Sequence, residues 1–133
     1  RAGEDKSSAG SGYYIHVQPG NAFLAGGAYQ PDTAWLQAIR RRLAHEGDRF
    51  RDILGEPVFV RYFGELQGER LKTHPRDYPA DHPEIDLLRH KSFLAMHPLG
   101  DDRLTRPDLV DHAARVFAAL KPFGDYLNAA REI

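Results

Sequence analysis

The spacing of strand-like segments constrains the fold of this 133-residue chain more than any other feature. Residues 13–18 alternate aromatic or β-branched side chains with polar ones, which predicts a strand. A Pro-Gly-Asn turn follows at 19–21, and residues 23–29 predict the returning strand of a hairpin. The next strand-like segment, residues 92–97, comes only after a long stretch of helix and loop, unlike regular βαβ alternation. We therefore predict an α+β fold: an antiparallel-biased sheet, made of a hairpin plus a distant strand, with helices packed on one face.

Capping residues and apolar spacing predict the helices. Asp32 follows a proline and precedes an apolar stripe at helical spacing, so it is expected to cap the first long helix. Further helices are predicted over residues 48–54, 57–63 and 84–88. Thr105 and Asp108 suggest a capping box for a C-terminal helix. Pro122 is expected to divide that helix into a kinked pair, because proline removes a backbone donor.

Two short runs have a structural interpretation beside a functional one. Gly26 and Gly27, inside the second strand, indicate a bulge or a close approach of another element, and a ligand is the alternative. Arg40, Arg41 and Arg42 resemble a nucleic-acid footprint, but three consecutive helical residues spread around the helix instead of sharing one face. We expect these arginines to be solvated.

Charge and cysteine content exclude several classes of protein. The net charge is −1, so the chain has no overall field to hold a polyanion, and a nucleic-acid partner is disfavoured. No apolar run approaches the ~20 residues that span a bilayer, so no membrane partner is expected. The absence of cysteine excludes disulfides and thiolate metal sites and fits a cytoplasmic location. Residues 1–12 are expected to form a mobile arm or linker, and residues 13–133 a single domain.

The segment 71–93 carries the candidate binding residues, because it combines basic, acidic, imidazole and proline residues in one loop-like stretch. Lys72, Arg76 and Lys91, with Tyr78 nearby, could converge on a phosphate or carboxylate, since a guanidinium fork and two ammonium groups suit such oxyanions. The alternative is that the cations form ion pairs with the acidic residues of the same segment. Those acidic residues are Asp77, Asp81, Glu84 and Asp86.

Asp81 and His82 are the candidate catalytic pair, because a carboxylate beside an imidazole can orient a general base. The alternative is structural: His82 forms a local hydrogen bond in the turn that precedes Pro83. No nucleophile elbow, phosphate-binding glycine loop or dinucleotide fingerprint accompanies them. No two histidines stand three or four residues apart, so no metal site is predicted, and the sequence names no cofactor.

Four stretches carry a family resemblance: segment 71–93, GYYIHVQPGNAFLAGGAYQP, GELQGERLK and LKPFGDYLN. Together they resemble, from Tyr13 to Asn128, the uncharacterised family catalogued as domain of unknown function 2461. The resemblance implies no activity. It does imply a longer N-terminal portion in family members, and glycine where this chain has Asp77. Because the chain starts at Arg1 without methionine, we expect it to be the C-terminal part of a larger domain.

Three function classes therefore stay open. The first is a domain that binds a small anionic ligand. The second is an acid–base enzyme domain that uses Asp81 and His82. The third is an interaction module, completed by a missing N-terminal segment or another chain, which would pair beside residues 13–18 or 92–97.

Overall fold

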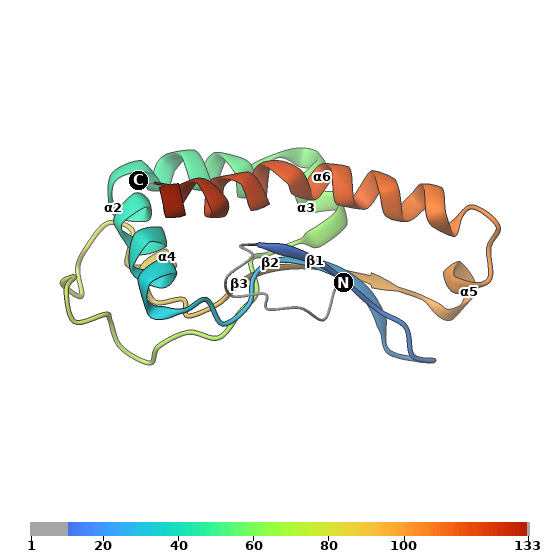
Figure 1. Ribbon diagram of the computed structural model, residues 1–133, viewed down its shortest axis with the longest axis horizontal. Helices are drawn as coiled ribbons and strands as arrows, with labels where there is room; N and C mark the ends of the chain where they lie inside the picture. The colour runs from blue at the N-terminus through green and yellow to red at the C-terminus, as the bar shows by residue number, and fades with distance from the viewer. Residues whose placement is uncertain (1–10, 133) are drawn as a thin grey trace.

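The computed structural model describes residues 11–132 and has the predicted α+β architecture. Three antiparallel strands form one sheet in the order β1-β2-β3, and the long helices lie on one face of it (Figure 1). The elements are β1 Gly12–His16, β2 Ala22–Ala28, α2 Thr33–Gly55, α3 Pro57–Phe63, α4 Ile85–Leu88, β3 Phe93–Leu99, α5 Asp101–Leu104, α6 Leu109–Ala129 and the short 3-10 helix η1 Ala130–Glu132. The hairpin and the distant strand are both confirmed.

The start of the described chain differs slightly from the prediction. The expected arm, residues 1–12, lies outside the described residues except for its last two. The Ser11 backbone N–H donates to Asn128 Oδ1 at 2.7 Å, and Gly12 already belongs to β1. The first strand therefore begins one residue earlier than the aromatic alternation indicates.

The two glycines of β2 mark close approaches, as predicted. A Cβ atom at Gly26 would lie 2.1 Å from the Leu120 side chain of α6. At Gly27, where φ is +127°, it would lie 2.0 Å from the Phe93 carbonyl oxygen on the neighbouring strand. The glycines thus let α6 and β3 pack directly against the central strand.

The outer edge of β3 is partly covered by the chain itself. Gln67 and Leu94 exchange both backbone hydrogen bonds, at 2.8 and 2.9 Å. The Lys91 N–H donates to the Glu69 carbonyl at 2.7 Å. One of the two edges expected to need a partner is therefore already occupied over its first residues. Within residues 11–132, no strand pairs with the outer edge of β1.

The long helix α2 begins as predicted but continues further. Asp32 Oδ1 accepts from the Trp35 N–H at 2.8 Å, which satisfies one free donor of the first turn. The separate helix expected over 48–54 is the second half of α2, and the two halves meet at Glu46, whose φ and ψ are −129° and 35°. The predicted pieces were correct, but the break between them is a kink and not a loop.

Two predictions near the C-terminus were wrong. Thr105 and Asp108 form no capping box: the Asp108 side chain makes no cap hydrogen bond, and the Thr105 hydroxyl donates to the Asp102 carbonyl at 3.0 Å. Pro122 lies inside a continuous α6. Leu120 and Phe123, on either side of it, are both buried in the same core, so tertiary packing outweighs the local cost of proline, about 3 kcal/mol.

Phe50 lies at the centre of that core. Its ring is 4.7 Å from the Tyr126 ring, 5.7 Å from that of Phe123 and 6.4 Å from that of Phe93, measured between centroids. These contacts join α2, α6 and β3 and hold the helical layer in a fixed position on the sheet.

Candidate functional site

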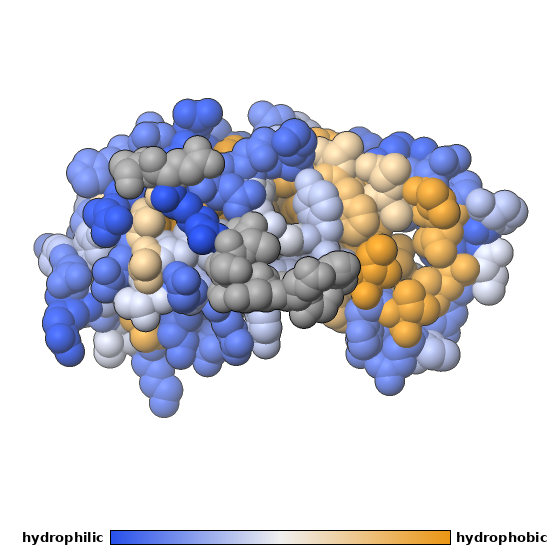
Figure 2. Space-filling view, viewed as in Figure 1, coloured by the Kyte–Doolittle hydropathy of each residue, from blue (hydrophilic) through white to orange (hydrophobic). Residues whose placement is uncertain are grey.

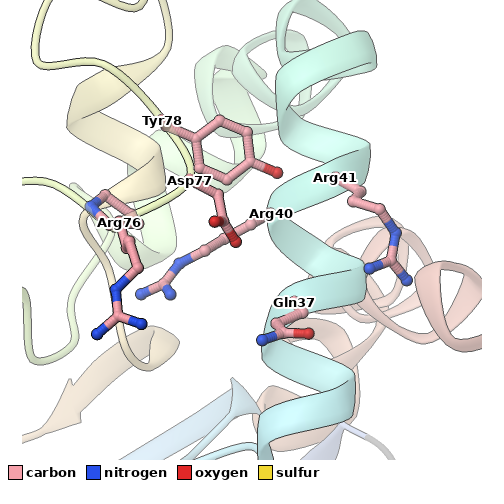
Figure 3. Close-up of a pocket in the computed structure, with 7 residues that line it drawn as sticks. Gln37, Arg40, Arg41, Arg76, Asp77 and Tyr78 are labelled. Atoms are coloured by element: carbon pink, nitrogen blue, oxygen red, sulfur yellow. The ribbon is translucent and has the colours of Figure 1, made fainter.

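A polar pocket lies where α2 meets the loop between α3 and α4 (Figure 3). We call it the arginine pocket; its volume is about 530 Å³. The residues that line it are Gln37, Arg40 and Arg41 from α2 and Pro75, Arg76, Asp77 and Tyr78 from the loop. It therefore brings together two segments separated by more than thirty residues in sequence.

Local structure explains why these side chains share one pocket. Gln37, Arg40 and Arg41 stand at positions i, i+3 and i+4 of a helix, which places them on adjoining positions of one face. Opposite them, a turn closes where the Tyr78 N–H donates to the carbonyl of Pro75, at 3.2 Å. The buried Pro75 holds this turn against the fold while Arg76 stays exposed.

Two backbone carbonyls hold the Arg40 side chain in the arginine pocket. Its Nε donates to the Leu88 carbonyl and its Nη2 to the His90 carbonyl, both at 3.0 Å. Partial burial lowers the pKa of Arg40 from its usual value, and the nearby Tyr78 opposes that shift. A guanidinium has five N–H donors, so this one keeps donors for a ligand after making both bonds.

The three consecutive arginines are therefore not a solvated run, and that prediction was wrong for two of them. Arg40 anchors the turn after α4, and Arg42 donates to the Tyr126 carbonyl while its guanidinium lies 3.9 Å from the centroid of that ring. Arg41 alone is exposed. The helix does spread the three around its axis, as expected, but the neighbouring elements α4 and α6 supply carbonyl acceptors to those on either side.

Asp77 is the one acidic side chain that lines the arginine pocket. Figure 3 shows its carboxylate on the same side of α2 as the guanidinium groups of Arg40 and Arg76. Within residues 11–132, no ion pair of 4.0 Å or less includes Asp77. The pocket therefore presents separate cationic and anionic groups instead of a closed salt bridge.

The structure brings together some of the ligand-binding residues predicted from the sequence. Arg76 and Tyr78 line the arginine pocket, whereas Lys72 and Lys91 do not. The Lys91 ammonium is 3.3 Å from a Glu69 carboxylate oxygen, across the short bridge beside β3. Lys72 is exposed, and its carbonyl accepts from Arg89.

Sequence reasoning missed the contribution of α2. Gln37, Arg40 and Arg41 form a polar i, i+3, i+4 set opposite the apolar stripe, and that pattern is visible in the sequence. It indicates a shared helix face but not which loop will cover it, because that pairing depends on tertiary contacts.

The candidate catalytic pair lies beside the arginine pocket. His82 Nδ1 accepts from the Glu84 backbone N–H at 3.0 Å, and its ring stands edge-on to Tyr78 with centroids 5.8 Å apart. This is the local hydrogen bond that the turn interpretation expects. No hydrogen bond in the described part of the chain joins His82 to Asp81, which is exposed. An acid–base role for the pair stays a prediction.

A second pair of histidines is joined directly. His97 Nε2 lies 3.0 Å from His112 Nε2, and His97 Nδ1 lies 2.8 Å from the Tyr62 carbonyl oxygen. The carbonyl can only accept, so His97 Nδ1 carries a proton and its Nε2 accepts from His112. Burial, then the nearby Arg103, lowers the pKa of His112. Among residues 11–132, no three histidine, cysteine or carboxylate side chains gather in a group that could hold a metal ion.

Comparisons with known proteins give one match. A family model described as "Conserved hypothetical protein (DUF2461)" matches residues 1–126. No curated protein and no solved structure matches the chain. Within the described residues, none of the helices combines the length and apolar character needed to cross a bilayer.

Proposed function

The chain belongs to the DUF2461 family of conserved hypothetical proteins, and we propose that it is an α+β domain that binds a small anionic ligand in the arginine pocket. The observation that carries the proposal is the meeting of Arg40 and Arg76, from two distant segments, on the same side of α2 at one pocket that Arg41 also lines (Figure 3). Guanidinium groups recognise carboxylate and phosphate through paired, charge-assisted hydrogen bonds. Phosphate, sulfate and carboxylate groups are the ligand chemistry that this arrangement fits.

Preorganisation of Arg40 supports this proposal over a random surface cluster. Its two hydrogen bonds to backbone carbonyls fix the guanidinium plane before any ligand arrives. Binding a ligand therefore costs less side-chain entropy than it would at an exposed cationic site, where a long side chain must first be ordered. Arg41 and Arg76 are exposed, so they contribute mainly electrostatic attraction of the ligand and hydrogen bonds to it once it is bound.

Phosphate at millimolar concentration is expected to raise the melting temperature more than chloride does at matched ionic strength, because a ligand of the folded state stabilises it by linkage. Arg76→Ala should weaken phosphate binding roughly tenfold or more, since a hydrogen bond to a charged group contributes about 1.5–3 kcal/mol. Thermal denaturation with and without phosphate measures the increment, and isothermal titration measures the affinity.

Arg106→Ala is the matched control, because Arg106 is exposed and lies outside the arginine pocket. Lys91→Ala tests whether the cations outside the pocket that the sequence suggested, Lys91 among them, contribute to phosphate binding. We expect no change in affinity from this variant. An equal phosphate increment in wild type and Arg76→Ala would contradict the proposal. Comparing variants at the same salt removes the general stabilisation that excluded anions give to any protein.

A second candidate function, an interaction module, is favoured by the edge of the sheet. Ile15 on β1 and Val17 just after it are 63% and 64% exposed, and Val110 on the first turn of α6 is 77% exposed. Figure 2 shows hydrophobic side chains gathered on this side of the molecule, over the hairpin and the first half of α6. Exposed apolar side chains beside a strand edge that no strand of residues 11–132 covers favour strand addition.

We propose a second copy of the chain as the partner at this edge. Residues 12–18 contain no lysine, arginine or carboxylate, so two β1 strands can pair antiparallel without like-charge contacts. The charged residues and prolines that often protect edge strands are absent from this stretch.

Ile15→Lys is expected to reduce self-association, because it places a charge at the centre of the proposed strand pair. Light scattering of wild type and variant across a concentration series measures the effect. Val58→Lys, which adds the same charge at an exposed valine of α3, serves as the control and should leave the association unchanged. A wild-type chain that stays monomeric at high micromolar concentration would remove this second candidate.

A further inference from the structure

Asp77 gives the arginine pocket a feature that a simple anion site lacks. Its carboxylate lies on the same side of α2 as the Arg40 and Arg76 guanidinium groups (Figure 3), and no cation in the described part of the chain lies within ion-pair distance of it. The turn closed by Pro75 and Tyr78 fixes the position of Asp77 in the loop. The pocket therefore holds an acceptor-only group next to groups that only donate.

This combination works against a ligand that carries only negative charge. Such a ligand gains attraction from the arginines but meets repulsion from the Asp77 carboxylate. A ligand with an oxyanion at one end and an ammonium group at the other satisfies both groups, because the ammonium donates to the carboxylate. The Tyr78 ring, which also lines the pocket, offers a further favourable surface for a cation.

The size of the pocket also exceeds that of a bare inorganic ion. Its volume of about 530 Å³ lies within the range of roughly 300–1,000 Å³ typical of small-molecule sites. An oxyanion bound by Arg40 and Arg76 would leave room beside it for the rest of a small organic molecule. Figure 3 shows the Asp77 carboxylate and the Gln37 amide in that surrounding space.

We propose that the ligand of the arginine pocket is a small zwitterion, an oxyanion that also bears a primary amine, and that Asp77 selects it by accepting from the ammonium group. This inference rests on the proposed function, because it assumes that the arginines hold the oxyanion. Asp77 is then the residue that determines specificity, while Arg40 and Arg76 supply affinity.

The test compares phosphoethanolamine with ethyl phosphate, which has the same phosphate ester but no amine. Ethyl phosphate carries more net negative charge at neutral pH, so attraction to the arginines alone would favour it. In the wild type, phosphoethanolamine is expected to bind at least about fivefold more tightly, as measured by isothermal titration. Asp77→Asn should remove that preference and strengthen the binding of ethyl phosphate, since it removes the repelling charge but keeps the shape.

Asp86→Asn is the matched control, because Asp86 is an exposed carboxylate on α4 outside the pocket. It should leave the preference unchanged. Tighter binding of ethyl phosphate than of phosphoethanolamine by the wild type, or an equal gain for both ligands in Asp77→Asn, would overturn the zwitterion proposal and leave the anion site standing. Binding of neither ligand, nor of inorganic phosphate, would remove the anion site itself.

Discussion

Gly27→Ala is expected to destabilise the protein by about 3 kcal/mol or more, because the added Cβ atom meets both an unfavourable backbone angle and a steric overlap. The φ angle of +127° is one that side chains rarely adopt. The added Cβ would also lie 2.0 Å from the Phe93 carbonyl oxygen and 2.9 Å from the Phe123 ring. Backbone cannot rotate away as a side chain can, so β2 and β3 must separate at this point.

Urea denaturation measures the loss of unfolding free energy. For a domain of this size, a loss of 3 kcal/mol corresponds to a fall in melting temperature of roughly 10–15 °C. Gly20→Ala is the matched control: Gly20 has φ of +76°, but no atom lies within 4 Å of its added Cβ. Gly20→Ala should lower the unfolding free energy by only about 1–2 kcal/mol, which is the cost of a positive φ for a residue with a side chain. Equal losses in the two variants would show that the contact with Phe93 is not what requires glycine.

The regular parts of the fold could be predicted because local chemistry determines them. Alternation from Tyr13, the turn at 19–21 and the capping Asp32 each act over a few residues, and the structure contains the hairpin and the helix that they predict. The glycine pair also indicated a close approach correctly. These features depend on backbone sterics and hydrogen bonding within one element or between adjacent ones.

The errors occurred where contacts outside the expected element outweigh its local preference. Pro122 should break a helix, yet the buried residues on both sides of it share one core, so α6 continues. Thr105 and Asp108 have capping side chains, but Asp108 lies 3.3 Å from Arg103 instead. In each case the competing partner lies in tertiary contact or in an unforeseen element, α5, and no local rule ranks that partner above the expected one.

Only some residues of the candidate site could be predicted from the sequence, for the same reason. Arg76 and Tyr78 stand close together in a segment rich in functional side chains, so sequence reasoning included them. Lys72 and Lys91 are equally close in sequence but lie outside the arginine pocket. Arg40 is remote in sequence, and only the docking of α2 against the turn after α4 places it beside Arg76.

Arg40→Ala is expected to weaken both the fold and the pocket, since the same guanidinium serves both. Its Nε donates to the Leu88 carbonyl at the end of α4, and its Nη2 to the His90 carbonyl two residues later. Carbonyls at a helix end have no partner within the helix, and hydrogen bonds from a charged donor contribute about 1.5–3 kcal/mol each before screening by solvent. We expect a loss of about 2–4 kcal/mol in unfolding free energy and loss of measurable phosphate binding.

Arg41→Ala separates the two roles. Arg41 is exposed, so its removal should change the unfolding free energy by no more than about 0.5 kcal/mol while still weakening phosphate binding. Arg40→Lys keeps the charge but not the planar fork, so it can replace only one of the two carbonyl contacts and should lie between wild type and Arg40→Ala in stability. If Arg40→Ala unfolded at the wild-type urea concentration, the bonds to α4 would carry no net stability. Arg40 would then line the arginine pocket without stabilising the contact between α2 and the turn after α4.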